Sequence, residues 1–418
     1  MSVLSQEDPD SYEIVLRERR RQSDNIVLIA SENHASPAVM EATGSILTDK
    51  YAEGKPGKRY YGGCQVVDDA EILARDRVLE LFGADHASVQ PHAGAMANMA
   101  AYASVLDPGD RVLAMDLNHG GHLTHGGSFN FSGKLYDFSS YGVNRESEQI
   151  DYEALEAKAR ELRPKLIVAG ASAYPRQFDF PRIRAVADSV GALFMFDMAH
   201  VAGLIAGGVH DNPVPFADIV TSTTHKTLRG PRGGLILCTE ALAKKVDSAV
   251  FPYVQGGPFM NVILAKAVAF HEALQPSFKE YARQVIDNAV ALADCLQEHG
   301  FHLVSGGTEN HLMVVSFLDR ELTGRQAQEA LESVGLVANK NLVPFDTRSS
   351  VHTSGLRLGT PASTTRGMRR QEMRQIGDWI VQRLQAPEDD RLAAEIRAGV
   401  EKLTERFPVP GAVQPVSV

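Results

Sequence analysis

Short apolar runs separated by helical patterns fill the middle of the chain. The runs lie at residues 111–115, 166–169, 193–196, 219–220 and 235–237. Between several of them, residues 151–162 and 182–190 have the spacing of apolar positions that is typical of amphipathic helices. Because buried strands alternate with helices here, the pattern predicts an α/β fold with a largely parallel sheet.

The two ends of the chain have a different pattern. Residues 11–25 and 36–50 predict charged helices, and residues 262–298 predict long helices. From about residue 300, short strands alternate with helices at 368–384 and 390–406. We therefore expect four parts: an N-terminal helical arm (1–50), a large α/β domain (51–285), a small C-terminal α+β domain (286–407) and a disordered tail (408–418).

Polar side chains that could take part in catalysis or binding follow two of the apolar runs. Asp197 and His200 come after the run at 193–196, and Thr223, His225 and Lys226 come after the run at 219–220. Ligands of α/β sheets bind at the carboxyl ends of the strands. We therefore expect these side chains to face one crevice.

Lys226 and Asp197 together indicate a cofactor. A desolvated lysine is nucleophilic and forms a Schiff base with an aldehyde. Pyridoxal 5'-phosphate (PLP) carries that aldehyde and needs an acid against its ring nitrogen, which Asp197 can supply. The alternative is an ordinary surface lysine in a basic loop with Arg229 and Arg232.

The turn Ala93-Gly94-Ala95 precedes a helix of small residues and can bring main-chain N–H groups to a phosphate. Tight packing is the other explanation of these small residues. The chain contains neither a GxGxxG nor a GxxxxGK[ST] pattern, which argues against a dinucleotide or nucleoside-triphosphate enzyme.

Three further groups of residues have two interpretations each. The stretch 119–125, HGGHLTH, could form a zinc site, but its twin glycines favour a loop and we expect no metal. Arg357 could clamp a substrate carboxylate or form a structural salt bridge. Tyr51 and Glu53 could exchange protons or lie in a solvated turn.

Composition limits the class of partner and compartment. The chain has 42 Lys and Arg against 52 Asp and Glu, so no basic excess favours nucleic acid. No stretch approaches the length of a membrane span. The three cysteines are far apart, which argues against a disulfide scaffold and indicates a cytoplasmic protein.

Long motifs in a fixed order resemble the serine hydroxymethyltransferase family of fold-type I PLP enzymes. They include LIASEN (28–33), KYAEGKPGKRYYGGC (50–64), HGGHLTHG (119–126), DMAHVAGL (197–204), TTHKTLRGPRGG (223–234), QGGP (255–258) and TSGLRLGTPA (353–362). The resemblance implies a mostly parallel seven-stranded sheet domain and a smaller C-terminal domain. It also implies a homodimer, or a tetramer built from it, whose active sites are shared between protomers.

The resemblance also implies cofactor ligands. Lys226 would form the Schiff base, Asp197 would hold the pyridine nitrogen, His122 would stack on the ring and His200 would lie by its phenolic oxygen. The other implied neighbours of PLP are the turn Ala93, Gly94 and Ala95, the flanking Ser172, Thr223 and His225, and Gly256, Gly257 and Tyr51 of the neighbouring subunit.

Substrate roles follow in the same way. The resemblance implies that Arg357, Ser31 and Tyr61 bind the amino-acid carboxylate and that Glu53 handles protons, with Tyr51 from the partner chain. The implied folate positions are Leu117, Gly121, Leu123 and Asn341. The implied reaction cleaves Cα–Cβ of serine to give glycine and transfers the one-carbon unit to tetrahydrofolate.

Several positions depart from the usual family pattern: Ala93 for serine, Met96 for glutamine, Tyr253 for glycine, Asn261 for histidine, Phe259 for leucine and residues 350–352 for Pro-Phe-Val. These departures favour an alternative, an α-methylserine hydroxymethyltransferase or aldolase that yields alanine and formaldehyde with folate dispensable. Threonine aldolase activity would be a side reaction of the same site. A folate- or RNA-binding protein without catalysis is disfavoured because Lys226, Asp197 and Arg357 are all present.

Overall fold

The computed structural model describes residues 2–411, which form two compact units. The larger unit comprises residues 38–283 and 343–345, and the smaller one comprises residues 2–37, 284–342 and 346–411. Residues 2–37 thus pack in the same unit as the C-terminal part of the chain. Of the tail expected at 408–418, residues 412–418 lie outside the described residues, and Val409 is buried.

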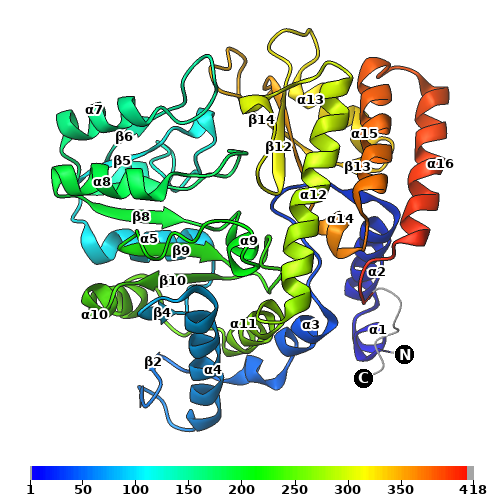
Figure 1. The fold of residues 1–418 in the computed structure, drawn as a ribbon. Helices are drawn as coiled ribbons and strands as arrows, with labels where there is room; N and C mark the ends of the chain where they lie inside the picture. Colours follow the sequence, from blue (N-terminus) through cyan, green and yellow to red (C-terminus); the bar gives the residue numbers. More distant parts are fainter. Residues whose placement is uncertain (1, 412–418) are drawn as a thin grey trace. The chain divides into compact units, whose positions relative to one another are not determined.

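The larger unit is built on a seven-stranded sheet with the order β4-β10-β9-β8-β7-β5-β6 (Figure 1). Antiparallel pairing occurs where β10 meets β4 and β9, and the remaining neighbours pair in parallel. The strands are β4 (His86–Ser88), β5 (Arg111–Met115), β6 (Asp137–Tyr141), β7 (Leu166–Ala169), β8 (Leu193–Asp197), β9 (Ile219–Thr223) and β10 (Gly234–Cys238). The predicted mostly parallel sheet is confirmed.

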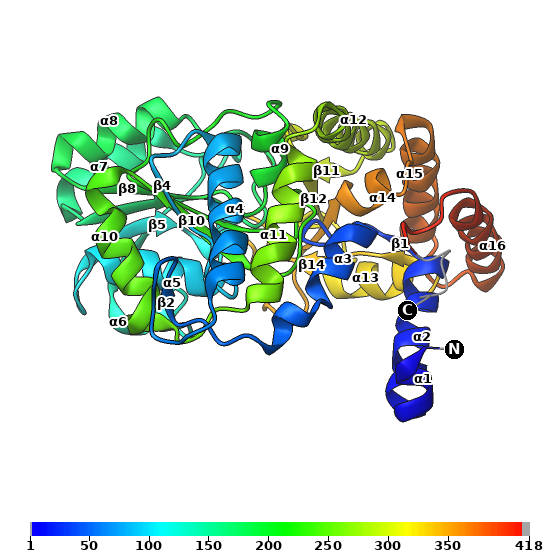
Figure 2. The same cartoon turned by 90° about the horizontal axis from the view of Figure 1, so that it is seen from below.

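Helices cover both faces of this sheet, which explains why its central strands are apolar without alternation. Side chains of α5 (Gly94–Val105) and α10 (Glu240–Ser248) form one core cluster with one face of the strands. On the other face, Phe180 of α8 (Phe180–Val190) packs edge-on against Phe196 of β8, with ring centroids 4.8 Å apart. Figure 2 shows α8 and α7 (Tyr152–Leu162) on the side of the sheet opposite α5.

Further elements of the larger unit lie around this sandwich. Helices α4 and α11 pack against each other. The remaining bounds are α3 (Pro37–Thr43), η1 (Ile46–Asp49), β2 (Gly54–Lys55), β3 (Lys58–Arg59), α4 (Gln65–Phe82), η2 (Leu117–His119), α6 (Phe131–Leu135), α9 (Ala202–Ala206), η3 (Ala249–Val254) and α11 (Met260–Ala273).

The smaller unit has an antiparallel sheet with the order β11-β12-β15-β14. A separate parallel pair joins β1 to β13. Its elements are α1 (Val3–Glu7), α2 (Pro9–Asp24), β1 (Ile26–Val27), α12 (Pro276–Glu298, from residue 284 onward), β11 (His302–Leu303), η4 (Val304–Gly306), β12 (Leu312–Ser316), α13 (Gly324–Glu332), β13 (Leu336–Val337), β14 (Asn339–Asn341), β15 (Gly355–Gly359), α14 (Pro361–Thr365), α15 (Arg370–Gln385) and α16 (Asp390–Arg406).

Two expectations about elements need correction. The single helix expected over 36–50 is wrong, because α3 ends at Thr43 and a separate 3₁₀ turn begins at Ile46, with Gly44 and Ser45 between them. The apolar pattern also gave no sign of β4 and β6. These strands form the two edges of the large sheet, and their sequences HAS and DFSSY are short or polar.

Candidate active site

The carboxyl ends of β8 and β9 bring Asp197 and the segment of Lys226 to one edge of the large sheet. The two strands are parallel neighbours, with Asp197 opposite Thr221. Lys226 follows the end of β9 by three residues and is only 9% exposed. An amine removed from water at this position has the environment in which lysine becomes nucleophilic.

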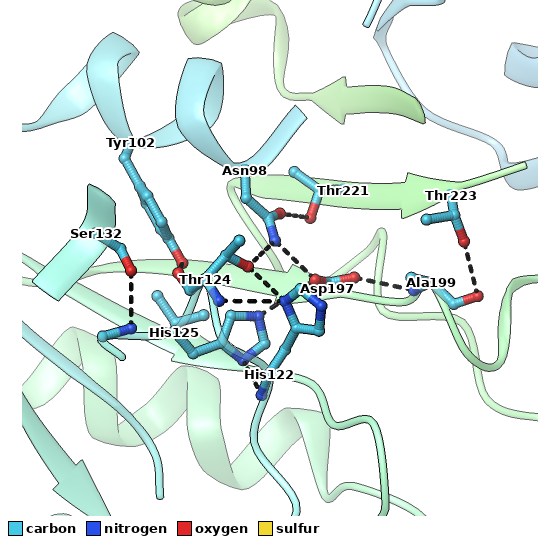
Figure 3. A network of polar contacts seen from close by, with 12 residues as sticks. Asn98, Tyr102, His122, Thr124, His125, Ser132, Asp197, Ala199, Thr221 and Thr223 are labelled. Atoms are coloured by element: carbon cyan, nitrogen blue, oxygen red, sulfur yellow. Dashed lines mark hydrogen bonds and ion pairs between the residues drawn. The ribbon is translucent and has the colours of Figure 1, made fainter. Parts of the chain in front are cut away.

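Asp197 is a largely buried carboxylate, with its side chain 10% exposed, and it stays ionised. One oxygen accepts hydrogen bonds from Asn98 Nδ2 (2.9 Å) and His125 Nε2 (3.2 Å), and the other accepts the main-chain N–H of Ala199 (3.0 Å) (Figure 3). Burial raises the pKa of Asp197, but its hydrogen bonds with His125 and Asn98 hold the pKa below its ordinary value. A fixed negative charge of this kind suits a protonated ring nitrogen.

The same network fixes His122. Its Nδ1 lies 2.7 Å from the hydroxyl of Thr124, which also accepts a hydrogen bond from Asn98 Nδ2 at 2.7 Å. Asn98 in turn accepts the hydroxyl of Thr221 at 2.6 Å, and Tyr102 donates to the carbonyl of Thr124 (Figure 3). Asn98 therefore couples the position of Asp197 to that of His122.

Three members of this network have roles that the sequence did not reveal. Asn98 lies one helical turn after Gly94 on α5, and Thr124 and His125 belong to the HGGHLTH stretch. Their spacing along the chain gives no sign that they converge on Asp197. The only available signal was their place inside two motifs that also carry expected ligands.

His122, His125 and Asp197 also offer three potential metal ligand atoms within 4.8 Å of one another. These groups already take part in hydrogen bonds. The Nδ1 atoms of His122 and His125 accept the main-chain N–H groups of Thr124 and His122, and His125 Nε2 donates to Asp197. The arrangement therefore serves to orient the carboxylate, as it would for an organic cation.

His225, next to Lys226, has a buried ring nitrogen, Nδ1, that forms no hydrogen bond within the described part of the chain. Burial, together with the charges of Arg232 and Lys226, lowers the pKa of His225 to about 3, so the ring is neutral at neutral pH. Buried polar atoms without a partner are rare in native proteins, and this one marks a place for a polar atom of a bound molecule.

The turn before α5 has the geometry of an anion site made from main chain. Ala93 is the N-cap residue of this twelve-residue helix and provides no side-chain cap. Gly94 lies so close to β9 that a Cβ there would be 2.5 Å from the Thr223 methyl group. The helix therefore presents its first N–H groups without side chains in front of them, as phosphate binding requires.

The lysine, the ionised acid, the unpartnered imidazole and the helix start provide what PLP needs: an amine for its aldehyde, an anion for its ring nitrogen and donors for its phosphate. The residues of this unit therefore fit the cofactor.

Comparison with known proteins decides the family. Residues 4–380 match the family model described as serine hydroxymethyltransferase. The chain belongs to this family. It is 56% identical over 407 residues to the serine hydroxymethyltransferase of Myxococcus xanthus (strain DK1622), which covers 97% of each chain.

Membership of the serine hydroxymethyltransferase family makes the protein a fold-type I PLP enzyme, with tetrahydrofolate as cosubstrate. The expected fold class and cofactors are confirmed. The comparisons do not favour the α-methylserine alternative, because both matches carry the name of the serine enzyme.

A second group of expected family residues gathers around Tyr51. Its hydroxyl donates to Glu53 Oε1 at 3.2 Å, and its ring packs edge-on against that of Tyr61, with centroids 5.0 Å apart. Gly257 lies beneath the Tyr51 ring, since a Cβ there would be 3.2 Å from it, and a Cβ on Gly256 would lie 3.1 Å from Glu53 Oε1. Tyr51 and Tyr61 are exposed.

The smaller unit carries Arg357, Ser31 and Asn341. Arg357 is buried in the middle of β15, where its Nε donates to Asn339 Oδ1 at 3.2 Å. Burial lowers the pKa of Arg357 to about 10, so the guanidinium remains charged at neutral pH. The segment that leads to Ser31 runs beside this strand, because the N–H of Gly359 donates to the carbonyl of Leu28 at 2.8 Å.

The remaining expected residues follow the strands of the large sheet. Leu117, Gly121 and Leu123 lie in the segment after β5, where a Cβ on Gly121 would be 2.3 Å from the carbonyl of Met115. Ser172 follows β7, and its N–H donates to the carbonyl of Gly120 at 2.7 Å. His200 follows β8 and is buried, and its carbonyl accepts the hydroxyl of Thr227.

Two departures from the family pattern have clear partners. Phe259 stacks on His92, with ring centroids 4.0 Å apart and planes 17° from parallel. Asn261 Nδ2 donates to the carbonyl of Thr43 at 2.7 Å. Tyr253, by contrast, is 75% exposed. Phe259 and Asn261 thus supply contacts of their own within the larger unit.

Proposed function

We propose that this protein converts L-serine and tetrahydrofolate to glycine and methylenetetrahydrofolate, using the residues at the carboxyl ends of β5, β7, β8 and β9. The observation that carries the proposal is that a buried lysine and a largely buried, ionised aspartate lie at the carboxyl ends of two neighbouring parallel strands. Family membership supplies the reaction.

When bound, PLP withdraws electrons from Cα of the amino acid and so allows its Cα–Cβ bond to break. We assign Lys226 as the residue that holds the cofactor covalently and Asp197 as the partner of its ring nitrogen. In this assignment His122 would lie against the ring, and His200, Ser172, Thr223 and His225 would surround it. Ala93, Gly94 and Ala95 direct main-chain N–H groups at the phosphate.

We assign substrate binding to charged and polar side chains. Arg357 keeps its charge and offers two parallel donors to a carboxylate, with Ser31 and Tyr61 as further donors. Glu53 moves the proton of the serine hydroxyl, and the hydroxyl of Tyr51 orients Glu53 through their hydrogen bond. Leu117, Gly121, Leu123 and Asn341 line the folate position in this assignment.

The protein acts on an amino acid and belongs to a family whose members are typically oligomeric. We infer a homodimer, or a tetramer built from it, in which Tyr51, Glu53, Gly256 and Gly257 complete the site of the neighbouring protomer. Several large apolar side chains of the larger unit are exposed, and a contiguous patch of such side chains would suit an interface between protomers. The exposed side chains include Met40, Ile46, Tyr51, Tyr60, Tyr61, Tyr253 and Phe259.

Among the described residues, no helix combines the length and apolar character needed to cross a bilayer. We propose a cytoplasmic location, where folate cosubstrates and reduced cysteines are both expected.

Product analysis tests the proposed function. The PLP-loaded protein is given L-serine or α-methylserine, each with and without tetrahydrofolate, and glycine and alanine are quantified. We expect glycine from serine, formed rapidly only with tetrahydrofolate, and little alanine from α-methylserine. Rapid alanine formation with slow turnover of serine would contradict the proposal.

A further inference from the structure

A lysine that the family chemistry does not use lies in the interior of the larger unit. Lys266, on α11, is only 1% exposed. Its Nζ donates to three main-chain carbonyls, those of Val89 (2.6 Å), Gly234 (2.8 Å) and Pro91 (3.0 Å). Three carbonyls match the three N–H groups of an ammonium ion. A buried ammonium is costly without such bonds, so the three hydrogen bonds hold these main-chain carbonyls around Lys266.

Two of the three carbonyls belong to the main chain that leads into the turn before α5. Val89 and Pro91 lie four and two residues before Ala93. Gly234, the first residue of β10, lies against the same turn, because a Cβ there would be 2.4 Å from the Ala93 carbonyl oxygen. The N–H of Gly234 also donates to the Pro91 carbonyl at 3.0 Å. Lys266 thus ties the start of β10 to the segment before the helix.

Gln255 holds the same segment through its other main-chain groups. Its Oε1 accepts the N–H of His92 at 2.9 Å, and its Nε2 donates to the carbonyl of Gln90 at 3.1 Å. Gln255 is buried as well. Two buried side chains therefore bind main-chain groups of four consecutive residues, 89–92, immediately before the turn.

This support matters more in this chain because the turn has no side-chain donor at Ala93. A phosphate must be bound by main-chain N–H groups, and their contribution depends on being oriented before the ligand arrives. We propose that Lys266 and Gln255 are positioning residues that fix the main chain of residues 89–93 for the phosphate of the cofactor. The proposal rests on the phosphate role assigned above to Ala93, Gly94 and Ala95.

The test compares PLP with pyridoxal, which lacks the phosphate. Dissociation constants of both for the cofactor-free protein, followed by absorbance, give a ratio that measures the contribution of the phosphate. Lys266→Met keeps the length of the side chain and removes its donors. We expect the PLP dissociation constant to rise about tenfold or more and that for pyridoxal to change by less than about threefold, so that the ratio falls.

Arg77→Met is the matched control. Arg77 Nη1 donates to the carbonyl of Ala267, the residue after Lys266 on α11, at 2.8 Å. This variant should lower the midpoint of thermal unfolding and leave the ratio unchanged. If Lys266→Met does not fold, Gln255→Leu tests the same segment and should lower the ratio as well.

The possible results distinguish failure of the positioning role, failure of the phosphate role of the turn and failure of the proposed function. An unchanged ratio in folded Lys266→Met, or in Gln255→Leu where it replaces that variant, overturns the positioning role, as does an equal fall in Arg77→Met. Equal affinities of the unaltered protein for PLP and pyridoxal overturn the phosphate role of the turn and the proposal with it. Failure of the unaltered protein to bind PLP at all overturns the proposed function itself.

Discussion

At the level of single residues, the site depends on keeping a buried carboxylate charged. Asp197 accepts hydrogen bonds from three N–H donors, and these bonds offset the free-energy cost of burying its ionised form. Asn98 is central because its amide reaches Asp197, Thr124 and Thr221 at once. The position of the anion and that of the His122 ring are therefore set by one side chain.

Asn98→Ala should weaken PLP binding by about tenfold, because Asp197 and His122 lose their common anchor. It should also lower the free energy of unfolding by about 1–3 kcal/mol, the cost of leaving buried groups unpaired. The control is Asn288→Ala, which removes a buried asparagine that bonds Thr364 and Met368 in the smaller unit. PLP titration and urea denaturation distinguish the two, and an equal loss of affinity in both variants would contradict the role of Asn98.

The neutral ring of His225 makes the stability of the cofactor-free protein depend on pH. Its folded pKa is about 3 against an ordinary value of 6.5, so the unfolded chain binds an extra proton between these values. The contribution of His225 is therefore fully present above pH 6.5 and is lost as the pH falls toward 3. The slope is about 1.4 kcal/mol per pH unit inside that window.

Denaturation curves of the cofactor-free protein between pH 6.5 and pH 4 check this prediction. His225→Gln removes the titrating group and should reduce the dependence of unfolding free energy on pH in this range. Identical pH dependence in the variant and the unaltered protein would contradict a neutral, buried His225.

At the level of helices, strands and turns, close approach of main chains shapes the site. The turn before α5, the start of β10 and the end of β9 meet at Gly234 and Gly94, where any side chain would meet other atoms at about 2.5 Å or less. Glycines therefore allow the close packing of the turn before α5, and Lys266 and Gln255 bind the main chain that leads into it. The shape of the turn depends on small residues that lie far apart in the sequence.

Gly234→Ala should displace the turn, because its Cβ would lie 2.4 Å from the Ala93 carbonyl oxygen. We expect PLP affinity to fall by about tenfold or more, measured by titration of the cofactor-free protein. Gly44→Ala is the control, since its Cβ would be in ordinary contact with the Met40 carbonyl at 3.7 Å. Full PLP affinity in Gly234→Ala would show that the turn tolerates displacement.

The sequence predicted the strands that contain continuous apolar runs. The strands β5, β7, β8, β9 and β10 each contain such a run and stood out, whereas the edge strands β4 and β6 did not. Thr323 and Gln326 form a capping box at the start of α13, and its two hydrogen bonds join residues three apart.

The site could be predicted only where a residue and its function share a motif. Asp197 ends β8 and Lys226 comes three residues after β9, so their place at one sheet edge could be inferred. Asn98, Lys266 and Gln255 act through hydrogen bonds to residues 26 to 177 positions away, and no local pattern reports such contacts. Sequence motifs therefore revealed the residues assigned to the chemistry, but not the residues that position them.

At the level of the whole molecule, the proposed site draws on a second protomer. Lys226 and Glu53 belong to the same unit of the chain, yet we assign them to different sites, with Glu53 serving the neighbouring protomer. This assignment makes a dimer necessary for activity and predicts that inactive variants can complement each other.

Coexpressed Lys226→Ala and Glu53→Gln chains test this arrangement. A mixed dimer has one site with both substitutions and one site with neither, so about a quarter of the activity of the unaltered protein should return at random pairing. Each variant alone should have almost none, and two Lys226→Ala chains carrying different tags form the control. Failure of the mixed dimers to recover activity would contradict shared sites.

The whole proposed chemistry depends on Lys226 being the residue that binds PLP. Borohydride reduction of the PLP-loaded protein, followed by peptide mass spectrometry, fixes the cofactor on the lysine that holds it. We predict one phosphopyridoxyl group per chain, located on Lys226, and loss of this label in Lys226→Ala. A label on another lysine of the unaltered protein, or an undiminished label in Lys226→Ala, would contradict this assignment.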